Sequence, residues 1–170
     1  KTNDGFIVKT STAEYHTKAL LLAIGRRGTP RKLGVPGEHQ TKVVYRLADP
    51  AQYRNQHVLV VGGGNSALEA AIAIGEEPGT TVTLSYRSKA FAKANPTVIE
   101  KLHDAVDAGR VNLELESTVN QISEEHVTLN VKHGELKIKN DGVIVCAGGI
   151  LPTPMLKTLG VEIETKHGTL

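Results

Sequence analysis

Residues 58–71 constrain the fold more than any other stretch, because they join an apolar run, a glycine-rich turn and a second apolar run. The first run, Val58–Val61, is typical of a strand that is buried on both faces of a parallel sheet. The alanine-rich run Ala67–Ile74 has helical spacing. The sequence therefore predicts a strand, a tight turn and a helix in direct succession.

The turn matches the dinucleotide-binding fingerprint G-x-G-x-x-G/A, with Gly62, Gly64 and Ala67 at the small positions. In this pattern the first glycine allows the turn, the second lets the backbone approach a pyrophosphate, and the alanine lets helix and strand pack closely. The pyrophosphate would rest on free N–H groups at the positive end of the helix. The alternative is a glycine-rich turn with a purely structural role.

The end of the next predicted strand, Thr80–Tyr86, indicates which nucleotide is bound. A carboxylate at this place would accept hydrogen bonds from the ribose 2′-hydroxyl of NAD, but the sequence has none there. Instead, Arg87 can make a forked contact with a 2′-phosphate, Ser88 can donate to it, and Lys93 can add charge. We therefore predict NADP(H) rather than NAD(H), the alternative being a solvated basic loop. Tyr86 either stacks on the adenine or is an exposed turn residue.

The other segments extend this pattern. We expect an N-terminal hairpin, a fully buried strand at 19–25, a short helix that starts at Asp49-Pro50 and a second helix from Asn95-Pro96 to Ala108. Further strands are expected at 43–45, 111–115, 118–122, 127–131, 135–138 and 143–149, a short helix at 155–159 and an edge strand from 161 onward. This order predicts an α/β fold, a doubly wound Rossmann-like parallel sheet with a three-stranded antiparallel β-meander.

The composition limits the kinds of partner. A net charge of +2 over 170 residues does not indicate nucleic acid, and no apolar run approaches the roughly 20 residues of a membrane-spanning helix. The single cysteine, Cys146, allows no internal disulfide or dithiol, and we expect a buried, inert thiol. We expect a cytoplasmic protein without a metal site.

Four segments, taken in order, resemble one family: Ala23–Gly25, Leu33–Glu38, Tyr53–Gln56 leading into 62–69, and Ala147–Thr153. They resemble the thioredoxin-reductase-like branch of the two-dinucleotide flavoproteins, the pyridine nucleotide-disulfide oxidoreductases. The resemblance implies a fragment of an FAD domain at 1–27, an NAD(P)H-binding domain at 28–150 and a return segment to the FAD domain at 151–170. The candidate cofactor-binding residues are Gly62, Gly63, Gly64, Asn65, Ser66, Ala67, Glu69, Tyr86, Arg87, Ser88, Lys93 and Gly148.

The resemblance also implies a function. In the full protein, NADPH would pass hydride to FAD, and the electrons would leave to an acceptor that the sequence does not identify. Tyr45 and Ala48 stand where thioredoxin reductases have their C-x-x-C cysteines, and dithiol exchange needs both thiols. We therefore expect an NAD(P)H-dependent flavoprotein oxidoreductase without the dithiol, of which this chain alone is incomplete and inactive. The alternative is a non-catalytic NADP(H) sensor, and a homodimer is left open.

Overall fold

The computed structural model describes residues 4–25 and 28–164. The chain divides into a larger compact unit, residues 30–148, and a smaller unit made of residues 1–29 and 149–170. None of the helices in the described ranges combines the length and the apolar character needed to cross a bilayer.

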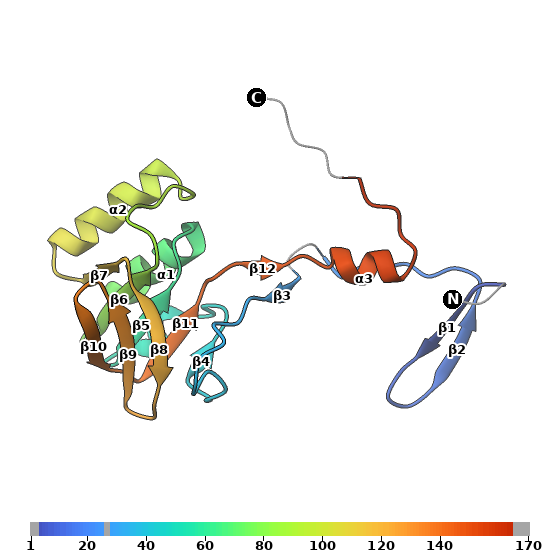
Figure 1. The fold of residues 1–170 in the computed structure, drawn as a ribbon, viewed down its shortest axis with the longest axis horizontal. Helices are drawn as coiled ribbons and strands as arrows, with labels where there is room; N and C mark the ends of the chain where they lie inside the picture. Colours follow the sequence, from blue (N-terminus) through green and yellow to red (C-terminus); the bar gives the residue numbers. More distant parts are fainter. Residues whose placement is uncertain (1–3, 26–27, 165–170) are drawn as a thin grey trace. The chain divides into compact units, whose positions relative to one another are not determined.

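A five-stranded parallel sheet forms the centre of the larger unit (Figure 1). Its strands, in spatial order, are β4 (Val43–Val44), β11 (Gly142–Val145), β5 (His57–Val61), β6 (Thr81–Tyr86) and β7 (Val111–Leu115). All four strand pairings are parallel. From β5 the chain adds β6 and β7 on one side, while β11 and β4 lie on the other side. The predicted doubly wound α/β class is thereby confirmed.

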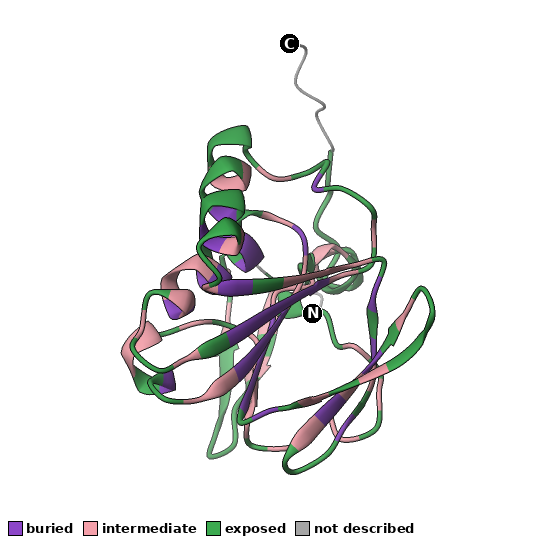
Figure 2. Ribbon diagram, turned by 90° about the vertical axis from the view of Figure 1, so that its left-hand side faces the viewer, coloured by how far each residue is buried: buried purple, intermediate pink, exposed green. Residues whose placement is uncertain are grey.

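Two different layers cover the sheet. The helices α1 (Asn65–Gly75) and α2 (Pro96–Asp107) share one core with alternate sheet residues such as Val58 and Val60. The antiparallel meander β8 (Thr118–Ile122), β9 (His126–Val131) and β10 (Gly134–Lys139) packs in a second core with Leu59 and its neighbours. The central strands consist mostly of buried residues (Figure 2), and these residues alternate between the two cores. Burial on both faces explains why these strands read as unbroken apolar runs.

The predicted helix starts are present with their capping contacts. The Asn95 side chain accepts a hydrogen bond from the Thr97 amide at 2.9 Å, and Pro96 occupies the first turn of α2. Asp49 accepts from the Ala51 amide at 3.0 Å and begins the 3₁₀ helix η1 (Pro50–Tyr53). In both cases the cap satisfies an N–H group that has no partner inside the helix.

The smaller unit contains the expected hairpin, in which β1 (Phe6–Lys9) pairs antiparallel with β2 (Glu14–Thr17). It also contains the short helix α3 (Thr153–Thr158). Where the chain passes between the units, β3 (Thr29–Pro30) pairs with β12 (Gly149–Ile150).

Two predicted strands are wrong. Residues 19–25 form no strand, and Leu21 in their middle is 90% exposed. An apolar run becomes a buried strand only where a neighbouring strand pairs with it and other layers cover it, and no described residue pairs with this run. Residues 161–164 also form no strand, and the rest of that predicted edge strand lies outside the described residues.

Glu38 organises the turn near the start of the larger unit. Its carboxylate accepts hydrogen bonds from the Leu33 and Gly34 amides, the latter at 2.8 Å, and from the Tyr45 hydroxyl at 2.9 Å. Burial on its own raises the pKa of Glu38, but these hydrogen bonds together hold that pKa below its usual value of 4.5. The ionised carboxylate therefore stabilises the folded state.

We expect Glu38→Gln to lower the free energy of unfolding by about 1 kcal/mol at pH 7, because a charged acceptor is lost. Since the folded pKa is depressed, this stabilisation is complete above the unfolded pKa and disappears as pH falls through the folded pKa. Urea unfolding at pH 7 and pH 3 should show a gap between wild type and variant that closes in acid. A gap of equal size at both pH values would contradict this role of the charge.

Candidate nucleotide-binding site

The candidate site lies where the carboxyl ends of β11, β5 and β6 meet at one edge of the parallel sheet. The Gly62 amide donates to the Ser85 carbonyl at 3.0 Å, and the Cys146 amide donates to the Val61 carbonyl at 2.7 Å. These bonds place the segments that follow each strand side by side. The strand order reverses at β5, and such switch points are where open α/β sheets bind ligands.

Gly62 is required by the fold itself. Its φ of +149° is in the region that glycine favours, and a Cβ there would come within 2.5 Å of the Cys146 carbonyl oxygen and 3.0 Å of the Ala67 Cβ. Ala67 is fully buried at the base of α1. Gly62 and Ala67 therefore let the turn and the helix pack closely against the sheet.

Gly64 has a different environment. It is the N-cap of α1 with an ordinary φ of −102°, and a Cβ on it would meet no atom of the described part of the chain within 4 Å. No side chain caps this helix end and no acidic residue lies in its first turn. Among the described residues, none accepts a hydrogen bond from the amides of residues 63–66. A helix end with free N–H groups and open space before it can bind an anion.

Tyr86 lies over the turn rather than in solvent. Its ring is close enough to Gly63 that a Cβ on that glycine would overlap it. The ring also stacks on Phe91, with centroids 5.2 Å apart and planes 10° from parallel. The interpretation of Tyr86 as an exposed turn residue is therefore wrong, because this half-buried ring has aromatic and glycine neighbours. Its stacking on adenine stays a prediction.

The other predicted residues of the turn either form hydrogen bonds within the chain or are exposed. The Asn65 side-chain oxygen accepts from the Asn95 amide at 2.7 Å. The Ser66 carbonyl accepts from the Cys146 thiol at 3.7 Å, and burial raises the pKa of that thiol. A partly buried thiol with a raised pKa agrees with the expected inert cysteine. Glu69 is exposed on α1.

The basic residues predicted to read the 2′-phosphate lie in the loop after β6. Arg87 and Lys93 are exposed, and neither forms a hydrogen bond or ion pair with the described residues. The Ser88 carbonyl accepts from the Glu116 amide at 3.4 Å. Lys89, by contrast, lies 3.9 Å from the Glu116 carboxylate. Arg87 is therefore the unpaired cation that immediately follows the strand.

Gly148 follows β11 at the same edge of the sheet. Its φ of +83° is in the left-handed region, and its carbonyl accepts from the Arg31 amide at 3.0 Å. No described residue lies within 4 Å of the position that its Cβ would take. Its proposed role in cofactor binding therefore stays a prediction.

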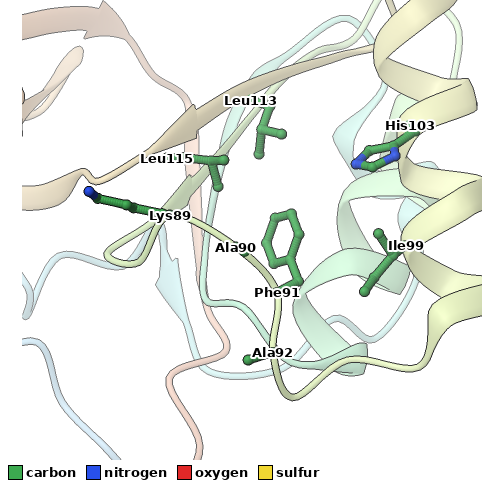
Figure 3. Close-up of a pocket in the computed structure, with 8 residues that line it drawn as sticks. All are labelled: Lys89, Ala90, Phe91, Ala92, Ile99, His103, Leu113 and Leu115. Carbon is green, nitrogen blue, oxygen red and sulfur yellow. The ribbon is translucent and has the colours of Figure 1, made fainter.

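Sequence reasoning missed Phe91 and the apolar pocket beside it. The pocket, of about 420 Å³, lies between the loop after β6, strand β7 and helix α2 (Figure 3). Ile99 and His103 of α2 and Leu113 and Leu115 of β7 point toward Phe91. No periodic apolar pattern surrounds Phe91. The chain has two phenylalanines, and this rarity is the feature of the sequence that could have drawn attention to Phe91.

Comparisons with known proteins place the chain among oxidoreductases. The family model described as pyridine nucleotide-disulphide oxidoreductase matches residues 1–169. A ferredoxin–NADP reductase of Ignicoccus hospitalis is 33% identical over 98% of this chain and 55% of its own length. The structure of the bacillithiol disulfide reductase Bdr (YpdA) from Staphylococcus aureus is similar with a TM-score of 0.83 and 29% identity, over 98% of this chain and 51% of that one.

A solved thioredoxin reductase of T. acidophilum is similar with a TM-score of 0.74 and 26% identity, over 96% of this chain and 55% of that one. The resemblance inferred from the four sequence segments is thereby confirmed. The chain spans about half the length of the curated relatives it matches.

Substitution of Gly62 should affect stability, whereas substitution of Gly64 should affect nucleotide binding. We expect Gly62→Ala to lower the free energy of unfolding by about 2 kcal/mol or more, because the methyl group overlaps backbone and the conformation is strained. We expect Gly64→Val to change stability by less than about 1 kcal/mol and to abolish nucleotide binding, because its side chain fills the open space. Thermal unfolding and calorimetric nucleotide titration measure both effects. Unchanged affinity in Gly64→Val would show that the turn is structural.

Proposed function

Because the chain belongs to the pyridine nucleotide-disulphide oxidoreductase family, we propose that residues 28–150 bind the nicotinamide dinucleotide of a flavoprotein oxidoreductase. In this proposal residues 1–27 and 151–170 belong to the FAD domain of the same polypeptide. The observation that carries it is the free, uncapped N-terminus of α1 beneath the open space at Gly64. This geometry suits a pyrophosphate, which needs close backbone approach and several N–H donors.

NADP(H) is the preferred nucleotide in this proposal. The end of β6 carries Arg87 in place of the carboxylate that would hold an NAD ribose. Glu116, which reaches the same loop, has Lys89 as its ionic partner, and Arg87 has no ionic partner within residues 4–25 and 28–164. An exposed guanidinium can form two parallel hydrogen bonds with a phosphate. The Ignicoccus relative is a ferredoxin–NADP reductase, which agrees with this preference.

In the complete protein, bound NADPH would supply hydride to FAD. The residues of this chain hold and orient the dinucleotide, a division of labour that is usual in cofactor enzymes. The Tyr45 hydroxyl donates a hydrogen bond to the Glu38 carboxylate, and the chain has one cysteine, so the C-x-x-C positions provide no dithiol. In this proposal the electrons leave the flavin by a route that does not use a C-x-x-C pair at these positions. We propose an NADPH-dependent flavin oxidoreductase without an internal dithiol relay.

Cofactor binding by the isolated chain tests whether residues 28–150 form the nucleotide site while the flavin site lies elsewhere in the protein. Its one dinucleotide fingerprint is at Gly62, so we expect the purified chain to bind NADPH and to carry no flavin. Absorbance spectra of the purified protein and calorimetric titration with NADPH measure the two properties. A flavin absorption band at close to one equivalent would overturn the assignment of residues 28–150.

Arg87→Ala tests the choice of nucleotide. We expect NADPH binding to weaken by about 1.5–3 kcal/mol, the scale of hydrogen bonds to a charged group, which is about ten- to a hundredfold. NADH has a hydroxyl in place of the 2′-phosphate, so its affinity should hardly change. The NADPH penalty should also shrink at high salt, because the charges are screened.

Lys89→Ala is the matched control for Arg87→Ala, because it removes one positive charge from the same loop but from a residue already paired with Glu116. We expect a much smaller loss of NADPH affinity in this variant. Equal losses for NADH and NADPH in Arg87→Ala would show that the arginine supports the loop. A wild-type preference for NADH would overturn the NADP(H) assignment.

A further inference from the structure

The loop of residues 87–94 is fastened to the glycine turn at both of its ends. At its start, the Tyr86 ring lies on Gly63. At its end, the Asn95 amide donates to the Asn65 side chain at 2.7 Å. Gly63 and Asn65 are two positions apart, in the turn and at the first residue of α1, so one short segment holds both ends of the loop that carries Arg87 and Ser88.

The first fastening explains why position 63 is glycine. Its φ is not in the left-handed region, so the backbone conformation does not demand glycine there. Space does, because any Cβ would overlap the Tyr86 ring. That ring is fixed in turn by stacking on Phe91, which is 7% exposed inside the loop, and the Tyr86 carbonyl accepts from the Ser117 amide at 3.1 Å.

The second fastening fixes where the loop becomes a helix. Asn95 is the N-cap of α2, since its own side chain accepts from the Thr97 amide. The same residue donates its backbone N–H to Asn65 in the first turn of α1. The Asn65 side-chain oxygen is therefore engaged with the loop and is not a free acceptor at the helix end.

We propose that the Asn65 side chain and the side-chain-free space at Gly63 position the 87–94 loop, and that both act on nucleotide choice through Arg87 and Ser88, while the backbone N–H groups of these residues stay available to the pyrophosphate. This inference rests on the proposed NADP(H) function. The two roles have different signatures, because the pyrophosphate is common to both nucleotides and the 2′-phosphate occurs in NADP(H) alone. A pyrophosphate ligand affects both affinities equally, whereas a positioning residue of this loop affects NADPH selectively.

The first experiment titrates Asn65→Ala with NADPH and with NADH. We expect the Kd for NADPH to rise about tenfold and the Kd for NADH to change less than twofold. Ser66→Ala is the matched control, because it alters the next residue of the same helical turn, whose side chain forms no hydrogen bond with the described residues. Any effect of Ser66→Ala should be equal for the two nucleotides. Equal losses in Asn65→Ala would overturn the proposal.

The second experiment is a double-mutant cycle between Gly63 and Tyr86. Gly63→Ala alone should weaken NADPH selectively, because the new methyl group displaces the ring. In a Tyr86→Ala background the ring is absent, so Gly63→Ala should then have no further effect on NADPH affinity. Full additivity of the two substitutions would show that the ring and the glycine act independently, and would overturn the first fastening.

Amide hydrogen exchange of Asn95 tests the second fastening without any nucleotide. We expect this amide to exchange faster in Asn65→Ala than in wild type and in Ser66→Ala, while core amides of β5 stay protected. Unchanged exchange at Asn95 would overturn the fastening whatever the titrations show. A wild-type chain that binds neither nucleotide would overturn the proposed function and the selectivity with it, while the exchange rate still decides whether the fastening exists.

Discussion

The burial of β5 on both faces is the constraint on which the larger unit depends. Val58 and Val60 belong to the helix-side core and Leu59 to the meander-side core, and all three are 2% exposed or less. Both edges of the strand are paired as well, with β11 and with β6. Because β5 has no free face or edge, it is fixed in position, and the turn that follows it inherits that rigidity. A binding site built on such a turn has little freedom to rearrange.

The three consecutive glycines of this rigid turn meet different steric requirements. Gly62 is in contact with the backbone after β11, and Gly63 leaves room for an aromatic ring. At Gly64, no described residue occupies the space that a side chain would fill. The same residue type thus meets three different physical demands within three positions. The fingerprint records only the need for small residues at two of them. The structure adds the reason for the glycine between them.

The elements that the sequence predicted well are those with a local signal. The apolar run before Gly62 and the Asn95-Pro96 cap each specify their structure within a few residues. Residues 19–25 have the same kind of apolar signal, yet they form no strand, because burial depends on partners that a single run cannot reveal. The contact of Asn65 with Asn95 spans 30 positions and has no periodicity. Such a side-chain contact depends on how α1 and α2 pack, and a pattern read along the chain does not contain that information.

The place of β11 in the sheet has a kinetic consequence. Its Val143 is opposite Val43 of β4, a hundred positions earlier, and its Gly142 is opposite Val58 of β5. Strand β4 therefore has no neighbour in the sheet until β11 has been synthesised and inserted between it and β5. Closing so long a loop costs chain entropy before any contact repays it, and parallel pairings of this kind form slowly. On a ribosome, the segment from β5 to β10 can assemble from sequential neighbours, whereas completion of the sheet waits for the last strand of the unit to emerge.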